Sequence, residues 1–177
     1  MREGGVGGGN TQTGLNFERK VDFQDLLAAR TGYAIKPVHD KAGKGVFFNG
    51  RLVARCFRKH DFYKFLEEEH VDWKSKVSRK LLPDDAMLVI VRETLFIIEV
   101  KYQQVTGSVD EKLQTCDFKR KQYVKLVAGL GLKVEYVYVL NDWFKVPAYK
   151  DMLDYIHNMN CHYKFNSLPL AWLGLPE

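Results

Sequence analysis

The chain has 177 residues, 46% of them apolar, and a formal net charge of +5. This length suits one domain with a substantial core, and the positive charge favours an anionic partner such as nucleic acid. The three cysteines form no Cys-x-x-Cys pair, which argues against a disulfide framework or a structural zinc site. No apolar run is long enough to span a membrane and the glycine-rich N-terminus is unlike a signal peptide, so we expect a cytoplasmic protein without a membrane partner.

The sequence divides into a short arm and one domain. Residues 1–13 are rich in glycine and nearly devoid of apolar side chains, which predicts a flexible arm. Residues 14–177 show no internal repeat and no second domain. We expect a domain core over about 14–140, followed by a C-terminal helix and tail over 141–177.

The domain is predicted to begin with a helix and three strands. Leu15–Ala29 has the apolar spacing of a helix. Tyr33–Val38 is a candidate strand. Val46–Ala54 is predicted to be a hairpin, because Asn49-Gly50 between two apolar runs favours a type I′ turn. A short helix is expected over Asp61–Glu69.

The centre of the chain, Pro83–Lys101, is predicted to be a second hairpin. Two apolar runs, Ala86–Val91 and Leu95–Val100, are joined by a short polar segment. The second run shows no polar alternation, which is typical of a strand buried on both faces.

The later elements are predicted to be a helix, a strand and a helix. A helix is expected over Val109–Leu130, because Ser108 and Glu111 match a capping box. Lys133–Leu140 is the clearest remaining strand, and it is expected to lie parallel to the central hairpin after the helical crossover. A further helix is expected over Ala148–Asn158.

Charged side chains are expected to meet at the open end of the central hairpin. Asp84 and Asp85 begin its first strand, while Glu99 and Lys101 end its second and leave the same face. Two carboxylates beside an ammonium suit a hard divalent cation whose bound water attacks a phosphodiester. The alternative, a solvated strand face, is disfavoured because a buried strand tolerates charges only when they are paired or bound to an ion.

At Pro83-Asp84 and Glu99-Val100-Lys101 the hairpin resembles the PD-(D/E)xK nuclease superfamily. The turn Gly107-Ser108, which opens a helix after the second strand, is similar to type II restriction endonucleases of that superfamily. Gly14–Glu18 resembles the first helix of restriction-type and resolvase-type members. The resemblance implies an α/β fold with the restriction-endonuclease-like αβββαβ core, in which helices flank a mixed central sheet.

The resemblance also implies site residues. Asp84 and Glu99 match the metal-binding carboxylates, and Lys101 matches the lysine that positions or activates the attacking water. The implied cofactor is Mg²⁺, with Mn²⁺ as a substitute. Glu18 matches a glutamate that binds the metal through water, and a solvated helix acid is an equal alternative for it.

Two further residues are predicted to lie close to this site. Asp85 competes with Asp84 for the metal, and strand parity does not choose between them because the strand start is uncertain. Asp84 is preferred because it follows Pro83, as in the family motif. Gln103 lies two residues beyond Lys101 on the same strand face, and it is expected to contact the residues that hold the metal rather than the metal itself.

Basic and polar side chains around the site are expected to contact DNA. Such contacts with phosphates position a duplex without reading its sequence, and the alternative for each is a solvated charge. The predicted set comprises Lys74, Lys76, Arg79, Lys80, Arg51, Arg55, Ser108, Lys112 and Lys119.

The resulting prediction is a Mg²⁺-dependent endonuclease that cleaves double-stranded DNA, most similar to a type II restriction endonuclease. It would act as a homodimer that matches a palindromic site, or as the catalytic small subunit of a two-protein enzyme. The alternatives are a repair or junction-resolving nuclease of the same fold, and a noncatalytic DNA-binding or partner-docking protein.

Overall fold

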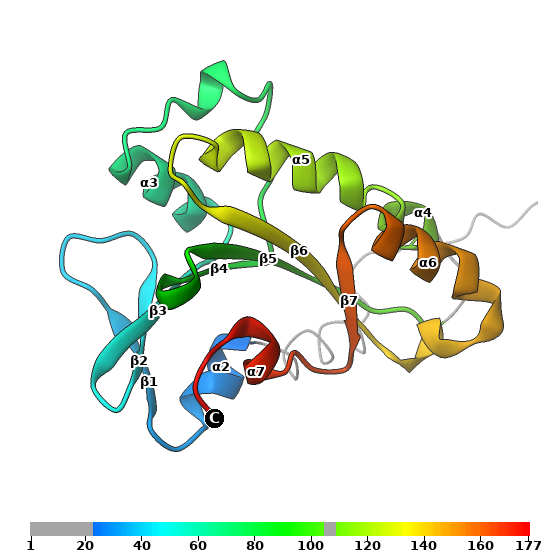
Figure 1. Ribbon diagram of the computed structural model, residues 1–177, viewed down its shortest axis with the longest axis horizontal. Coiled ribbons are helices and arrows are strands. Elements are labelled where there is room, and N and C mark those ends of the chain that lie inside the picture. Colours follow the sequence, from blue (N-terminus) through cyan, green and yellow to red (C-terminus); the bar gives the residue numbers. More distant parts are fainter. Residues whose placement is uncertain (1–22, 105–108) are drawn as a thin grey trace, which may run out of the picture.

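The sheet at the centre of the molecule is mixed and runs in chain order. The computed structural model describes residues 23–104 and 109–177. Within these residues, seven strands form one sheet in which each strand lies beside its predecessor in the sequence (Figure 1). The strands are β1 (Tyr33–Pro37), β2 (Lys44–Phe48), β3 (Arg51–Phe57), β4 (Asp85–Val89), β5 (Thr94–Lys101), β6 (Lys133–Leu140) and β7 (His162–Phe165). Strands β1 to β5 pair antiparallel, and β5, β6 and β7 pair parallel.

Helices cover both faces of this sheet, which confirms the predicted α/β class. The helices are α2 (Phe23–Ala28), α3 (His60–Glu68), α4 (Val109–Leu113), α5 (Cys116–Val127), α6 (Lys150–Asn158) and α7 (Leu170–Leu173), with 3₁₀ turns η1 (Trp73–Ser75), η2 (Ile90–Arg92), η3 (Asp142–Lys145) and η4 (Pro147–Tyr149). Figure 1 shows α3, α5 and α6 on one face and α2 and α7 on the other. Each group packs on its own apolar cluster. Among the described residues, no helix has the length and apolar character needed to cross a membrane.

Strand β5 lies at the centre of both clusters. Leu95 and Ile97 belong to the cluster under α3 and α5, whereas Phe96 and Ile98 belong to the cluster under α2 and α7. The first six residues of the strand are buried. This confirms the prediction of a strand that is apolar on both faces, and it means that a charge placed on β5 enters a largely dry environment.

Two other predicted elements, a β-turn and a strand, are confirmed, and both were predicted from neighbouring residues alone. Asn49 and Gly50 both have positive φ, +47° and +80°, as a type I′ turn requires, and they join β2 to β3. The predicted strand Lys133–Leu140 matches β6 and pairs parallel with β5. Both signals are short-range: a turn dipeptide in one case and an apolar run rich in valine and tyrosine in the other.

Three elements differ from the prediction. The predicted helix over 109–130 is divided into α4 and α5, because the Thr115 hydroxyl bonds the Lys112 carbonyl at 2.6 Å and ends the first helix. The turn between β4 and β5 is longer than expected, with η2 followed by Glu93 in the left-handed region. The tail contributes β7, whose residues are all half-buried and so show no alternating pattern in the sequence.

Candidate active site

Three of the predicted site residues meet at the open end of the β4–β5 hairpin. Asp84 directly precedes β4, and its Oδ2 accepts a hydrogen bond from the Val100 N–H at 3.1 Å. The Lys101 Nζ lies 3.1 Å from Glu99 Oε2 and 3.7 Å from Asp84 Oδ2. One ammonium therefore bridges the two carboxylates, and a main-chain hydrogen bond fixes the position of the more exposed one.

Asp85 is held in a different environment. Its Oδ1 accepts hydrogen bonds from Gln24 Nε2 at 3.0 Å and from Arg58 Nε at 3.3 Å. Neighbouring residues of a strand point to opposite faces, so the register that aims Asp84 at Lys101 aims Asp85 elsewhere. The geometry thus favours Asp84 as the carboxylate that works with Glu99.

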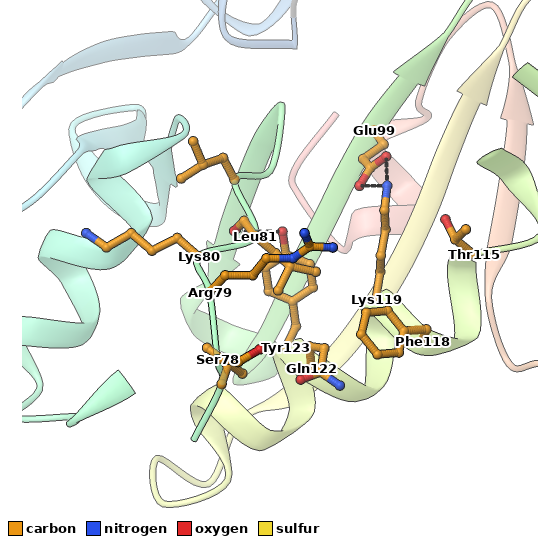
Figure 2. A pocket seen from close by; sticks show the side chains of 12 residues that line it. Ser78, Arg79, Lys80, Leu81, Glu99, Thr115, Phe118, Lys119, Gln122 and Tyr123 are labelled. Atoms are coloured by element: carbon orange, nitrogen blue, oxygen red, sulfur yellow. Dashed lines mark hydrogen bonds and ion pairs between the residues drawn. The ribbon is translucent and has the colours of Figure 1, made fainter. Parts of the chain in front are cut away.

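Helix α5 adds a second lysine to the site. The Lys119 Nζ lies 2.9 Å from Glu99 Oε1 and 2.8 Å from Oε2, so it holds both oxygens (Figure 2). Lys119 was predicted to contact DNA, and its ion pair with Glu99 was not predicted. A signal was present: Lys119 stands three residues after Cys116 and four before Tyr123, on the buried stripe of α5.

The carboxylate of Glu99 is buried and yet ionised. Its side chain is only 7% exposed. Burial by itself would raise the pKa of Glu99, but the charges of Lys101 and Lys119, together with the hydrogen bonds from Lys119, outweigh that effect and hold the pKa below its ordinary value. Nearby phenols are neutral: burial and the Glu99 charge both raise the pKa of Tyr136 and Tyr123.

The donor chemistry at this point fits a hard divalent cation. Asp84 and Glu99 supply carboxylate oxygens, and Mg²⁺ is usually held by one or two carboxylates while it keeps several waters. Within residues 23–104 and 109–177, no group of three His, Cys, Asp or Glu side chains gathers into a metal site. Among the described residues, Asp84 and Glu99 are the two carboxylates here that could hold such a cation, and the Lys119 ammonium beside Glu99 shows that positive charge is favoured at this position.

Three other predicted site residues are Glu18, Ser108 and Gln103. Glu18 and Ser108 lie outside the described residues. Gln103 is 5% exposed, and its main chain is fixed by Asn141, which accepts from the Gln103 N–H at 3.1 Å and donates to its carbonyl at 2.8 Å. The side-chain amide of Gln103 has no hydrogen-bond partner among the described residues.

Most of the predicted DNA contacts are at the surface, but the prediction for Arg55 requires a correction. Arg55 is 8% exposed, donates to both oxygens of Glu68 at 3.0 and 2.9 Å, and donates to the Ala42 carbonyl at 2.8 Å. Arg55 is therefore a buried structural residue, and its guanidinium is not placed to contact DNA. Lys74, Arg51 and Lys112 are exposed, as a phosphate contact requires.

The basic loop that precedes Asp84 faces α5. Lys76 donates to the Lys125 carbonyl at 3.2 Å, which ties the loop to the helix, and Lys80 lies over the ring of Trp73 at 4.8 Å. Arg79 lines a cavity of about 450 Å³ between this loop and α5 (Figure 2). Glu99 and Lys119 line the same cavity, so the loop, the helix and the carboxylate site share one opening.

A comparison with known protein families agrees with this geometry. The family model of a PD-(D/E)XK nuclease superfamily domain matches residues 50–160, a range that includes the whole β4–β5 hairpin and α5. The chain belongs to the PD-(D/E)XK nuclease superfamily. The match is to the superfamily as a whole and singles out no restriction endonuclease. No curated protein and no solved structure matches the chain.

Proposed function

We propose that this PD-(D/E)XK protein is a divalent-metal-dependent nuclease that hydrolyses phosphodiester bonds in DNA. The observation that carries the proposal is the bridge from Asp84 through the Lys101 ammonium to Glu99. A buried, ionised glutamate at the end of a central strand is costly to maintain, and a cation-dependent reaction gives a reason for it.

Each residue has a definite chemical task in this proposal. Asp84 and Glu99 would hold the metal, which would lower the pKa of the attacking water and stabilise charge on the phosphate. Lys101, already within 4 Å of both carboxylates, orients the attacking water and faces the scissile phosphate. Lys119 keeps Glu99 ionised and in place before the metal arrives.

Mg²⁺ is the cofactor that we propose, with Mn²⁺ as its substitute. Oxygen ligands alone, with two carboxylates and room for water, suit both ions. The exposed lysines and arginines around the cavity are proposed to hold phosphates of the substrate, consistent with the net charge of +5.

The finer proposal is a sequence-specific type II endonuclease acting on double-stranded DNA. It is supported by the sequence resemblance of Gly107-Ser108 and the following residues to that class. One site cleaves one strand, so a double-strand cut requires a homodimer or a partner subunit with a second site. A repair or junction-resolving nuclease is the second candidate. The cavity beside Glu99 favours it, because the cavity has the size and lining to receive an unpaired nucleotide.

The test is cleavage of plasmid and phage DNA with Mg²⁺, with Mn²⁺ and with EDTA. We expect metal-dependent cleavage that falls by about a hundredfold or more in Lys101→Ala and Glu99→Gln. Lys121→Ala is the matched control, since Lys121 lies on the same helix as Lys119 but pairs with Asp117 at the surface.

The product pattern separates the two candidates. Discrete bands indicate the type II endonuclease, whereas a smear indicates a repair or nonspecific nuclease. Cleavage by folded Lys101→Ala protein at the wild-type rate contradicts the proposed site, and the absence of cleavage on linear, plasmid and branched DNA contradicts the proposed activity. Thermal unfolding of each variant checks that the fold is intact.

A further inference from the structure

The cavity beside Glu99 has a composition that the hydrolytic site alone does not explain. It lies between residues 77–82 and α5, and its volume is about 450 Å³. Pockets that enclose small molecules usually measure about 300–1,000 Å³, so a group the size of one nucleotide fits here. Glu99 lines the cavity, which places any occupant next to the proposed scissile phosphate.

Exposed apolar side chains line the cavity on both sides. Phe118 on α5 is 59% exposed and Leu82 is 41% exposed, although both are large hydrophobic side chains. Figure 2 shows Phe118 beside the Lys119 side chain, with Tyr123 further along the same helix. An aromatic ring kept in solvent beside a charged site is a typical platform for a nucleobase, because every base offers a flat face for stacking.

Cationic side chains line the same cavity. Arg79 extends across the cavity toward the end occupied by Glu99 and Lys119, whereas Lys80 points away from it (Figure 2). A guanidinium and an ammonium at one end, with the ring of Phe118 beside the Lys119 side chain, match a molecule that joins a phosphate to a flat ring. A nucleotide has both features.

A base inside an intact duplex cannot use this cavity. Both of its faces are covered by neighbouring bases and its edge is paired, so it reaches an aromatic wall only after it leaves the stack. Unstacking and unpairing cost a few kcal/mol, and a base that is already unpaired avoids that cost. A cavity that receives a base in this way therefore distinguishes unpaired nucleotides from paired ones, rather than one kind of base from another.

We infer that this cavity binds an unpaired nucleotide of the substrate strand, with its base against Phe118 and its phosphate toward Arg79 and Lys119. The inference rests on the proposed nuclease function, and it favours the second candidate, a repair or junction-resolving nuclease, over the type II endonuclease. The preferred DNA has a single-stranded segment next to the scissile phosphate, as at a frayed end, a flap or a branch. A continuous duplex is bound less tightly.

The experiment measures binding without turnover. Fluorescence anisotropy in EDTA gives the affinity of the full chain for a fluorescein-labelled single-stranded oligonucleotide and for the blunt duplex of the same sequence. Loss of one base-aromatic stack lowers affinity by about fivefold or more, so Phe118→Ala is expected to weaken single-strand binding by that factor and Phe118→Trp to retain it. Duplex binding is expected to change little in either variant.

Val124→Ala is the matched control. Val124 lies on the same helix and is 39% exposed, but it is not among the residues that line the cavity. Wild-type affinity for the single strand in Phe118→Ala, or an equal loss for single strand and duplex, overturns the inference. Metal-dependent cleavage by the same wild-type preparation is measured in parallel, so that failure of the cavity assignment is distinguished from failure of the nuclease assignment.

Discussion

Replacement of Lys119 by methionine tests the electrostatic structure of the site most directly. Methionine keeps much of the hydrocarbon length of lysine and removes only the charge and its donors. In the native site the ammonium contacts both oxygens of Glu99 at 2.8 and 2.9 Å, and the Glu99 side chain is 7% exposed. In the variant, the Lys101 ammonium at 3.1 Å is the remaining lysine partner of that carboxylate.

The expected cost follows from these contacts. A hydrogen bond to a charged group contributes about 1.5–3 kcal/mol, and the removal of one partner from a buried pair is costly because the other charge stays behind. Since Lys101 continues to neutralise Glu99, we expect the free energy of unfolding of the metal-free protein to fall by about 2–3 kcal/mol. For a chain of this length, that corresponds to a drop in Tm of about 4–12 °C.

The assay is urea denaturation at pH 7, in EDTA and again in saturating Mg²⁺. Lys121→Met is the control, because its exposed i,i+4 pair with Asp117 contributes about 0.5 kcal/mol or less. We expect the deficit of Lys119→Met to shrink in Mg²⁺, since a cation bound by Glu99 restores the missing positive charge. Equal stabilities for the two variants in EDTA refute the argument, and a deficit that Mg²⁺ leaves unchanged refutes the shared cation position.

Three further predictions concern Asp84, Asp85 and the Arg55–Glu68 pair. Asp84→Asn is expected to reduce metal-dependent cleavage by about a hundredfold or more, and Asp85→Asn by about tenfold or less, in a plasmid assay; the reverse order contradicts our choice of ligand. Arg55→Met is expected to lower the free energy of unfolding by about 3 kcal/mol, against about 0.5 kcal/mol or less for the exposed Arg51→Met on the same strand, as measured by urea denaturation. Burial would raise the pKa of Glu68, but the Arg55 guanidinium, the Ala42 N–H and Lys41 lower it to about 2. Because this pKa is depressed in the folded state, the stabilisation is present above the ordinary value of 4.5 and is lost as the pH falls toward 2, so acid unfolding of Glu68→Gln should show a shallower pH dependence over that range.

Sequence patterns predicted the parts of the fold that depend on short-range signals. The alternation of Glu99 and Lys101 fixed their common face, and the apolar run before them indicated a buried strand, as β5 is. The Asn49-Gly50 turn formed as expected because positive φ at both positions follows from the residues themselves. These features need no knowledge of distant contacts.

The parts that could not be predicted depend on tertiary register. Whether Asp84 or Asp85 faces Lys101 is decided by the pairing of Asp85 with Ile98, and a shift of one residue would exchange the two carboxylates. Arg55 and Lys119 both looked like members of a basic surface. Each is turned inward by a carboxylate from another part of the chain, Glu68 in one case and Glu99 in the other.

The last strand of the sheet was also not predicted, because it too depends on tertiary contacts. β7 adds to β6 through main-chain hydrogen bonds, and its half-buried side chains follow no period that a sequence scan would detect. The division of the long helix at Thr115 likewise depends on one hydroxyl that bonds a carbonyl rather than water.

The order of the strands has a consequence for how the chain folds. Because each strand of the described sheet joins the one before it, the sheet can grow by addition to one edge. The β4–β5 hairpin already brings Asp84 close to Glu99, but at that stage β5 is an unpaired, apolar edge, which is a hazard for aggregation. Docking of α5 and pairing of β6 supply Lys119 and cover that edge together. On a folding pathway that adds strands in this order, α5 and β6 would complete the candidate site and cover the apolar edge in the same step, so variants that weaken the contact between α5 and Glu99 are expected to lose soluble yield as well as activity.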